Sequence, residues 1–303
     1  MNLPDLRVFT VVARHDSLHA AAEELHLTPS AISKALKRLE EELGLPLFDR
    51  STRQLVLNER GALLLDRART LLDLEEQARI DLQGKRAEMD CRIGGPAVLL
   101  WHHGGGLAKG LDPYPGARLH LRPLFEGEAL AALARGELHA ALVTQEALDS
   151  PHWSPGWEAT DLGELALNVI AASSHPLARK GRKPVQAVDV LEHPFASPAR
   201  SLFCGQARGS RSDGWRDDLL PRTIRYWADD LQVLLGFVRE GRALAYLPDV
   251  AAGEHGLVAI RVADLGFASR EQLRLVWNAA RAPRWLRELA ASLGSRSASS
   301  GRR

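Results

Sequence analysis

The chain has 303 residues, of which 45% are hydrophobic and 25% charged, and its formal net charge is +1. This length is enough for two domains with separate cores and is long for one. The balanced charge excludes a polycationic protein, so any surface that attracts nucleic acid must be local. The two cysteines, Cys91 and Cys204, form no Cys-x-x-Cys or Cys/His cluster. We therefore expect no disulfide framework, no bound metal and no cofactor.

The hydrophobic residues are spread along the chain. No uninterrupted apolar stretch is long enough to cross a membrane. The first residues also lack the apolar core and cleavage site of a signal peptide. These two features predict a cytoplasmic protein with no membrane partner.

The first 44 residues predict three short helices. The first runs over about 4–15, with a proline near its start. Ser17 is a suitable N-cap for a second helix over Leu18–Leu25. Thr28 and Pro29 then begin a third helix that ends at Gly44. The second and third helices have the spacing of a helix-turn-helix.

The third helix has an uneven charge distribution. Its core face is Ile32, Leu36, Leu39 and Leu43. Thr28–Arg38 contains three basic residues and no acid, whereas Glu40–Glu42 are three acids. A helix half that enters the major groove of DNA needs hydroxyls, amines and cations of this kind. The alternative is an ordinary amphipathic helix with a solvated polar face, which we would favour for an isolated helix. The helix before it and the segment after it favour DNA binding.

Residues 45–57 predict a strand-turn-strand wing. Leu47 and Phe48 are expected to pack under the helices, and Arg50 and Arg53 lie at the tip, where a wing reaches phosphates or the minor groove. Residues 1–58 are thus predicted to form an all-α, winged helix-turn-helix domain that binds double-stranded DNA. The candidate DNA contacts are Thr28, Pro29, Ser30, Ser33, Lys34, Lys37, Arg38, Arg50 and Arg53.

Residues 59–88 predict one long linker helix, capped by Asn58. An apolar stripe on so long a helix needs a partner helix, because one small domain cannot cover it. We expect the partner to come from a second copy, which gives a dimer, or a tetramer built from two dimers, and a dyad-symmetric DNA site. Packing on the same chain is the alternative. The predicted stripe is Leu64, Ala68, Leu71, Ala78 and Leu82.

From about residue 89 onward, strands alternate with helices, which is typical of an α/β domain with a mostly parallel sheet. The expected strands are Cys91–Ile93, Leu119–Arg122, Ala140–Val143, Leu167–Ala171, Ile224–Tyr226, Leu244–Leu247 and Leu273–Trp277. The expected helices are Gly127–Arg135, Asp230–Glu240 and Pro283–Leu293.

The N-terminal motifs are similar to the signature of LysR-type transcription regulators. They are Leu6–Phe9, Ser17–Leu27, Thr28–Lys34 and Leu39–Arg50, and the resemblance that they carry extends over about the first 65 residues. Later runs also resemble the family: Arg92–Gly94, Leu133–Leu138 with Ala141–Val143, Ser174–Ala178 and Gly241–Pro248. The resemblance implies a regulator that responds to a small-molecule effector, acts with RNA polymerase and pairs its linker helices antiparallel between subunits.

The resemblance further implies that residues 89–303 form a two-lobed effector domain like a periplasmic binding protein. Lobe I would hold about 89–162 and 266–294, and lobe II about 163–265. Effectors bind in such folds at the carboxyl ends of strands, in the crevice at the crossover. The candidate contacts are Gly95, Pro96, Ala97, Trp101, Thr144, Gln145, Ser197, Pro198, Ala228, Asp229 and Tyr246.

The chain departs from the family after Gly94. The hydroxyl residue that usually precedes the next helix is missing, and Gly104–Gly106 weaken that helix. An anionic effector, held at a helix N-terminus, is therefore in doubt. Trp101, His102 and His103 would instead suit an aromatic or weakly basic pocket, although a core tryptophan and solvated histidines are the favoured interpretation.

Three rival interpretations remain. Cys91 and Cys204 would serve a thiol-redox sensor of the same architecture, although burial is the ordinary role of such a cysteine. An enzyme lacks support, because no metal-binding triad, nucleophile elbow or phosphate loop is present. A solute-binding protein would need an export signal and no helix-turn-helix. We therefore predict a protein that is not an enzyme.

Overall fold

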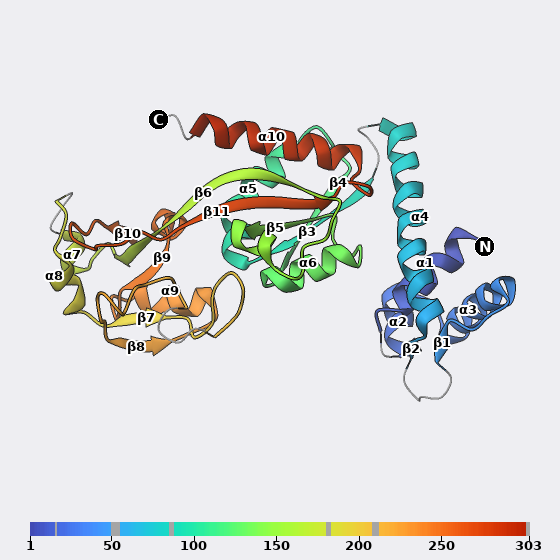
Figure 1. Cartoon of the computed structure of the whole chain (residues 1–303), viewed down its shortest axis with the longest axis horizontal. Coiled ribbons are helices and arrows are strands. Elements are labelled where there is room, and N and C mark those ends of the chain that lie inside the picture. Colours follow the sequence, from blue (N-terminus) through green and yellow to red (C-terminus); the bar gives the residue numbers. More distant parts are fainter. Residues whose placement is uncertain (16, 50–54, 85–87, 180–182, 208–211, 301–303) are drawn as a thin grey trace. The chain divides into compact units, whose positions relative to one another are not determined.

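The computed structural model describes residues 1–15, 17–49, 55–84, 88–179, 183–207 and 212–300. The chain forms two compact units. The first is Met1–Met89 with Tyr114–Ala117, and the second is Asp90–Pro113 with Arg118–Arg303. Figure 1 shows that the first unit is helical around the long helix α4, whereas the second combines sheets with helices.

The first unit begins with the three expected helices, whose predicted caps are confirmed. The hydroxyl of Ser17 accepts a hydrogen bond from the Ala20 amide, and that of Thr28 from the Ala31 amide. His26 ends the second helix in the left-handed conformation (φ 52°), and Gly44 ends the third in the same way. The helices are α1 (Leu3–Val12), α2 (Leu18–Leu25) and α3 (Pro29–Leu43).

A two-stranded wing and the long helix complete this unit. The strands β1 (Phe48–Asp49) and β2 (Val56–Leu57) pair antiparallel, and α4 (Glu59–Gln83) follows. The amide oxygen of Asn58 caps α4 by accepting from the Gly61 amide at 2.9 Å, while its Nδ2 donates to the Pro46 carbonyl. The core unites all four helices with the wing around Phe9, Ile32 and Leu47, which are at most 1% exposed.

In the second unit, lobe I is a sheet covered by helices. Strand β3 pairs parallel with β5, and β4 lies beyond β3 at the edge of the sheet. The elements are β3 (Met89–Gly95), α5 (Ala97–Gly110), β4 (Ala117–Pro123), α6 (Glu126–Ala134), β5 (Ala140–Thr144), the short 3-10 helix Gln145–Asp149 and the late helix α10 (Arg284–Ser300).

Two long strands, β6 (Trp157–Ala172) and β11 (Arg270–Asn278), connect the lobes. They run side by side and antiparallel, and β6 continues into lobe II (Figure 1), where it pairs with β9 and β10. The β6–β11 pairing is interrupted by a bulge at Leu162 and Gly163. Lobe II consists of α7 (Pro176–Arg179), α8 (Ala187–Leu191), β7 (Phe195–Ser197), β8 (Ile224–Trp227), α9 (Leu231–Arg239), β9 (Ala245–Pro248), the 3-10 helix Asp249–Gly253 and β10 (Leu257–Ile260).

The sheet corrects one expectation. It was predicted to be mostly parallel, but β11 runs antiparallel to both β5 and β6, and β6 runs antiparallel to β9 and β10. The reason is topological, because the chain leaves lobe I along one strand and must return along another that runs the opposite way. Helix α5 is also intact in spite of its glycines, since Gly106 and Gly110 lie close to leucine side chains of α10.

Candidate DNA-binding surface and ligand cavity

Helix α3 divides cleanly into a buried face and an exposed polar face. Ile32, Ala35, Leu36 and Leu39 are buried in the core of the first unit. Ser30, Ser33, Lys34 and Lys37 are exposed, and their spacing of three, one and three residues places them on one face of the helix. The structure thus brings together four of the predicted DNA contacts. Thr28 serves as the cap of this helix, and its hydroxyl lies 3.2 Å from the Ser30 hydroxyl, while Pro29 is half-buried.

The two lysines of this face are open to solvent. Lys37 lies 3.6 Å from Glu41 one turn later, but both side chains are more than 60% exposed, and such a pair contributes little. Lys34 has no ion pair with any residue that the structure describes. Both ammonium groups are therefore available to an external anion such as a phosphate.

Arg38 has a different role from the lysines. Its Nε and Nη2 donate to the two carboxylate oxygens of Asp5 at 3.1 and 2.6 Å. This hydrogen bond is the main reason that the pKa of the buried Asp5 is lowered, against the opposing effect of burial. The pair joins α3 to α1 and fixes the angle at which the polar face is presented. Arg38 is thus a positioning residue for α3.

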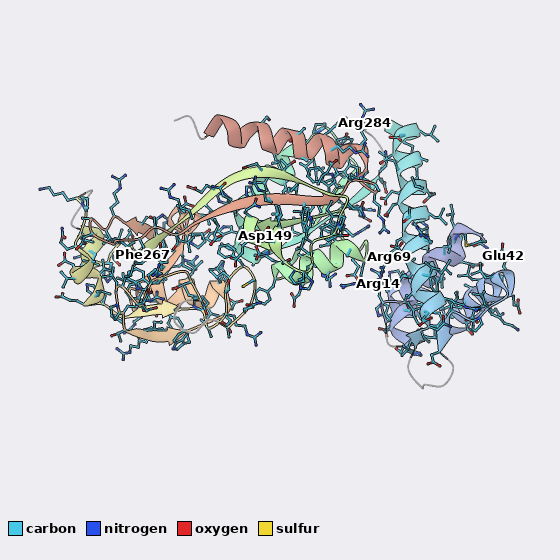
Figure 2. All side chains as sticks on the ribbon, viewed as in Figure 1. Arg14, Glu42, Arg69, Asp149, Phe267 and Arg284 are labelled. Carbon is cyan, nitrogen blue, oxygen red and sulfur yellow. The ribbon has the colours of Figure 1, made fainter. Side chains whose placement is uncertain are left out.

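The acidic end of α3 has a structural role within the first unit. The Glu40 carboxylate accepts a hydrogen bond from the Leu47 amide at 2.7 Å, which holds the turn into the wing. Glu42, labelled in Figure 2, is exposed near the end of α3. The predicted wing contacts Arg50 and Arg53 lie outside the described residues.

The exposed stripe of α4 differs from the predicted one. Ala68 is fully buried, so the expectation that it faces another subunit is wrong, while Leu64 is half-buried against the core of the same unit. Leu71, Ala78 and Leu82 of the predicted stripe are exposed, whereas its first two members lie on the side of α4 that packs on the core of the unit. The exposed stripe is formed by Leu63, Leu71, Leu74, Ala78 and Leu82, of which Leu74 is 59% and Leu82 89% exposed.

The second unit holds a cavity of about 350 Å³ between its lobes. The first turns of α5, α6 and α9 and the loop after β7 surround it. Four of the predicted effector contacts line it: Pro96, Ala97, Trp101 and Asp229. The remaining lining residues are Val98, Pro123, Leu124, Phe125, Glu128, Arg200, Ser201, Leu202, Asp230, Leu231 and Gln232.

The other predicted contacts do not line this cavity. Thr144 and Ser197 are buried, and Ser197 donates to the Asp213 carboxylate at 3.1 Å. Tyr246 is fully buried against Trp215, and this burial raises the pKa of its phenol. The carbonyl oxygen of the Gln145 side chain accepts from Arg274. Gly95, Pro198 and Ala228 complete the set, and they too are absent from the lining. These positions were chosen because they follow strands, whereas most of the cavity lining comes from the first turns of α5, α6 and α9 and from the loop after β7.

Some of the missed residues carried a signal in the sequence. Asp230 precedes the apolar run of α9, as an N-cap does, and its Oδ1 accepts from the amides of Gln232 and Val233. Glu128 reaches back to the Phe125 amide at 3.0 Å in the same manner at the start of α6. The loop that carries Arg200 had no such pattern. In the structure this loop meets lobe I, because the Phe203 carbonyl accepts a hydrogen bond from the Glu126 amide.

The histidines after Trp101 lie outside the cavity lining. His102 is exposed, as the favoured interpretation had it. His103 is half-buried, and burial, aided by the neighbouring His102 ring, lowers its pKa to about 4. Trp101 packs against lobe II residues and contributes to the cavity wall. The favoured interpretation was thus right for His102 alone.

The cysteines are not paired with each other. Cys91 is buried in β3, and Cys204 is half-buried in the loop after β7. Within the described parts of the chain, no group of three or more metal-ligating side chains is present. Nor does any helix in those parts have the length and apolar character needed to span a bilayer.

A capped recognition-type helix with a wing, joined to a two-lobed domain with a cavity, defines a ligand-responsive DNA-binding regulator. Residues 3–62 match the family model described as "Bacterial regulatory helix-turn-helix protein, lysR family", and residues 105–297 match "LysR substrate binding domain". The chain belongs to the LysR family of transcriptional regulators, so it has a DNA-binding and an effector-binding domain. The prediction made from the sequence motifs is confirmed.

Curated relatives agree with this assignment. The chain is 30% identical to the SDS degradation transcriptional activation protein of Pseudomonas sp. (strain ATCC 19151), over 84% of this chain and 81% of that protein. It is 34% identical to the transcriptional regulator CbbR of Rhodospirillum rubrum over 59% of each chain.

Solved structures share the fold at low identity. A full-length variant of OxyR from Pseudomonas aeruginosa matches with a TM-score of 0.66 and 19% identity, over 97% of this chain and 94% of that one. Full-length CbnR complexed with its target DNA matches with a TM-score of 0.59 and 20% identity, over 98% and 100%. LysG from Corynebacterium glutamicum, with the effector Arg bound, matches with a TM-score of 0.58 and 20% identity, over 99% of each.

Proposed function

We propose that this regulator binds a dyad-symmetric operator as a homo-oligomer, with one α3 helix from each subunit in the major groove. The observation that carries the proposal is the exposed face formed by Ser30, Ser33, Lys34 and Lys37, opposite the buried face of a helix capped at both ends. Hydroxyls suit base edges, and the lysines suit phosphates. Arg50 and Arg53 of the wing would add contacts beside the groove.

The exposed stripe of α4 supports self-association. Leu63, Leu71, Leu74, Ala78 and Leu82 are spaced eight, three, four and four residues apart, which is close to a coiled-coil seam. Exposed leucines in such a row favour a partner helix of the same kind. The subunits would form a dimer, or a tetramer from two dimers, in the cytoplasm where the chromosome lies.

The inter-lobe cavity is the proposed effector site. It is lined from both lobes, so a ligand there contacts both and favours one relative arrangement of them. The ligand shifts the regulator between two states only by the difference in its affinity for each. We propose that this shift alters DNA contact or contact with RNA polymerase, and that the protein has no catalytic activity of its own.

The experiment is a binding titration of the full-length protein on its own upstream intergenic DNA across a salt series. Saturable, dyad-dependent and salt-sensitive binding is expected. Binding no tighter than to random DNA of equal length, there and in a genomic footprint, would refute the operator model.

The oligomer is tested separately by the mass of the particle in solution. Leu74→Glu should raise the concentration for half-assembly by more than about ten-fold, since it places a charge in the seam. Val188→Glu, at a position 64% exposed on α8, is the matched control. Equal assembly of both variants would argue against the α4 stripe.

A further inference from the structure

The cavity between the lobes has an unusual distribution of charge. Its lining contains the carboxylates of Glu128, Asp229 and Asp230 and a single guanidinium, that of Arg200. The formal charge of the lining is therefore negative by two. A site with this balance favours a cation over an anion by electrostatic complementarity.

Backbone amides hold each carboxylate in place. One oxygen of Asp229 accepts from the amides of Ala199 and Arg200 at 2.8 and 3.0 Å, and one oxygen of Asp230 accepts from the amides at the start of α9. Glu128 accepts from the Phe125 amide with one oxygen. For each of the three, the second oxygen has no hydrogen-bond partner among the described residues. An ionised carboxylate can accept several hydrogen bonds, so these oxygens suit ligand N–H donors.

The rest of the wall is apolar and partly aromatic. Trp101 and Phe125 provide rings from lobe I, and Leu202 and Leu231 provide aliphatic surface from lobe II. Aromatic faces attract organic cations, and apolar walls accept a hydrocarbon body. The volume of about 350 Å³ is at the small end of ligand sites, which limits the ligand to metabolite size.

The start of α5 does not reverse this preference. Pro96 caps it without any side-chain hydrogen bond, so the first amides of the helix remain open to an acceptor. An anion placed there would still share the cavity with three carboxylates and one guanidinium.

We propose that the inter-lobe cavity binds a small organic cation, an amine or guanidine with an aromatic or aliphatic body, whose N–H groups bond to Asp229, Asp230 and Glu128. This inference rests on the proposed effector role of the cavity and adds the chemical class of its ligand. Arg200, which is exposed as the three acids are, would accommodate a polar substituent of the same molecule.

The test compares two probes of similar size and opposite charge, 2-phenylethylamine and phenylacetate, by calorimetric titration of the full-length protein. The amine should bind at least about ten-fold more tightly than the acid. Asp229→Asn/Asp230→Asn should weaken amine binding at least about ten-fold, since both amides keep the acceptors that the backbone uses. Glu192→Gln, which removes an exposed acid outside the cavity, should leave it unchanged.

Three results would overturn the proposal: phenylacetate binding as tightly as the amine, neither probe binding up to about 10 mM, or amine affinity unaltered in the double variant. Glu128→Gln provides a second variant if the double variant fails to fold by circular dichroism. Operator binding is measured on the same preparations. Intact operator binding with any of the three results refutes the ligand class alone, whereas loss of operator binding by the wild-type protein refutes the proposed function.

Discussion

Replacing Gly61 with alanine should destabilise the first unit, although the same change usually stabilises a helix. A Cβ at Gly61 would lie 2.1 Å from the Leu47 carbonyl oxygen and 2.9 Å from a methyl group of Leu57. The first of these is backbone that the wing holds in place, so it cannot move aside easily. Overpacking costs about 1–3 kcal/mol or more, against a helix gain of up to about 1 kcal/mol. Because the clash is with backbone, we take the upper end of this cost and expect a net loss of about 2 kcal/mol.

The sequence offers a clean assay for this loss. All seven tryptophans lie at or beyond Trp101, so their fluorescence follows the second unit only, while far-ultraviolet circular dichroism follows both. Gly61→Ala should lower the unfolding midpoint seen by circular dichroism and leave the fluorescence midpoint in place. Gly105→Ala, in α5 with no atom within 4 Å of the new Cβ, is the control and should be neutral or stabilising. An unchanged or higher circular dichroism midpoint for Gly61→Ala would refute the reasoning.

Three further predictions concern DNA, pH and the lobes. Lys34→Ala should weaken operator binding and reduce the slope of log affinity against log salt by about one. The control Lys109→Ala, in α5, should change neither the affinity nor the slope. A slope for Lys34→Ala equal to that of the wild-type protein would contradict the phosphate contact. Burial, followed by the charge of a nearby arginine, lowers the pKa of His139 to about 3. The unfolded chain therefore binds more protons than the folded chain between pH about 6.5 and 3. The free energy of unfolding should fall on acidification by up to about 1.4 kcal/mol per pH unit, measured by tryptophan fluorescence. His139→Phe should flatten this dependence of stability on pH. Gly205→Val should weaken ligand binding in the cavity, because Gly205 has φ +70° and a Cβ there would lie 2.5 Å from the Phe125 ring; unaltered calorimetric affinity would contradict this.

Local signals in the sequence were sufficient to predict the helix caps of the first unit and the exposed face of α3. The caps at Ser17, Thr28 and Asn58 depend on a side chain and an amide three residues later, so no distant part of the chain can change them. The exposed face of α3 follows from the same local periodicity. The stripe of α4 was harder, because two apolar faces lie side by side and only the packing of α1 decides which one is buried.

The full lining of the ligand cavity could not be predicted from local sequence patterns. Asp229 was found because it follows a strand, as expected for this type of domain. Trp101 was a candidate because the aromatic stretch after Gly94 departs from the family pattern. Glu128 and Arg200 come from segments more than seventy residues apart, and tertiary folding alone brings them to one cavity. Helix α5 showed the same limit, since its glycines lower helix propensity and also permit the close packing of α10.

The bulge in β6 has a mechanical consequence. At Leu162 and Gly163 the hydrogen-bonded ladder with β11 skips one residue, and Gly163 adopts φ +94°. Bulges increase the local twist of a strand pair, and a ladder that is already interrupted resists torsion least. We therefore expect the strand pair to twist most easily at this bulge. Occupancy of the cavity would be converted into a small rotation about the strand axis, a displacement that grows with distance from the bulge and is largest at the far surfaces of each lobe.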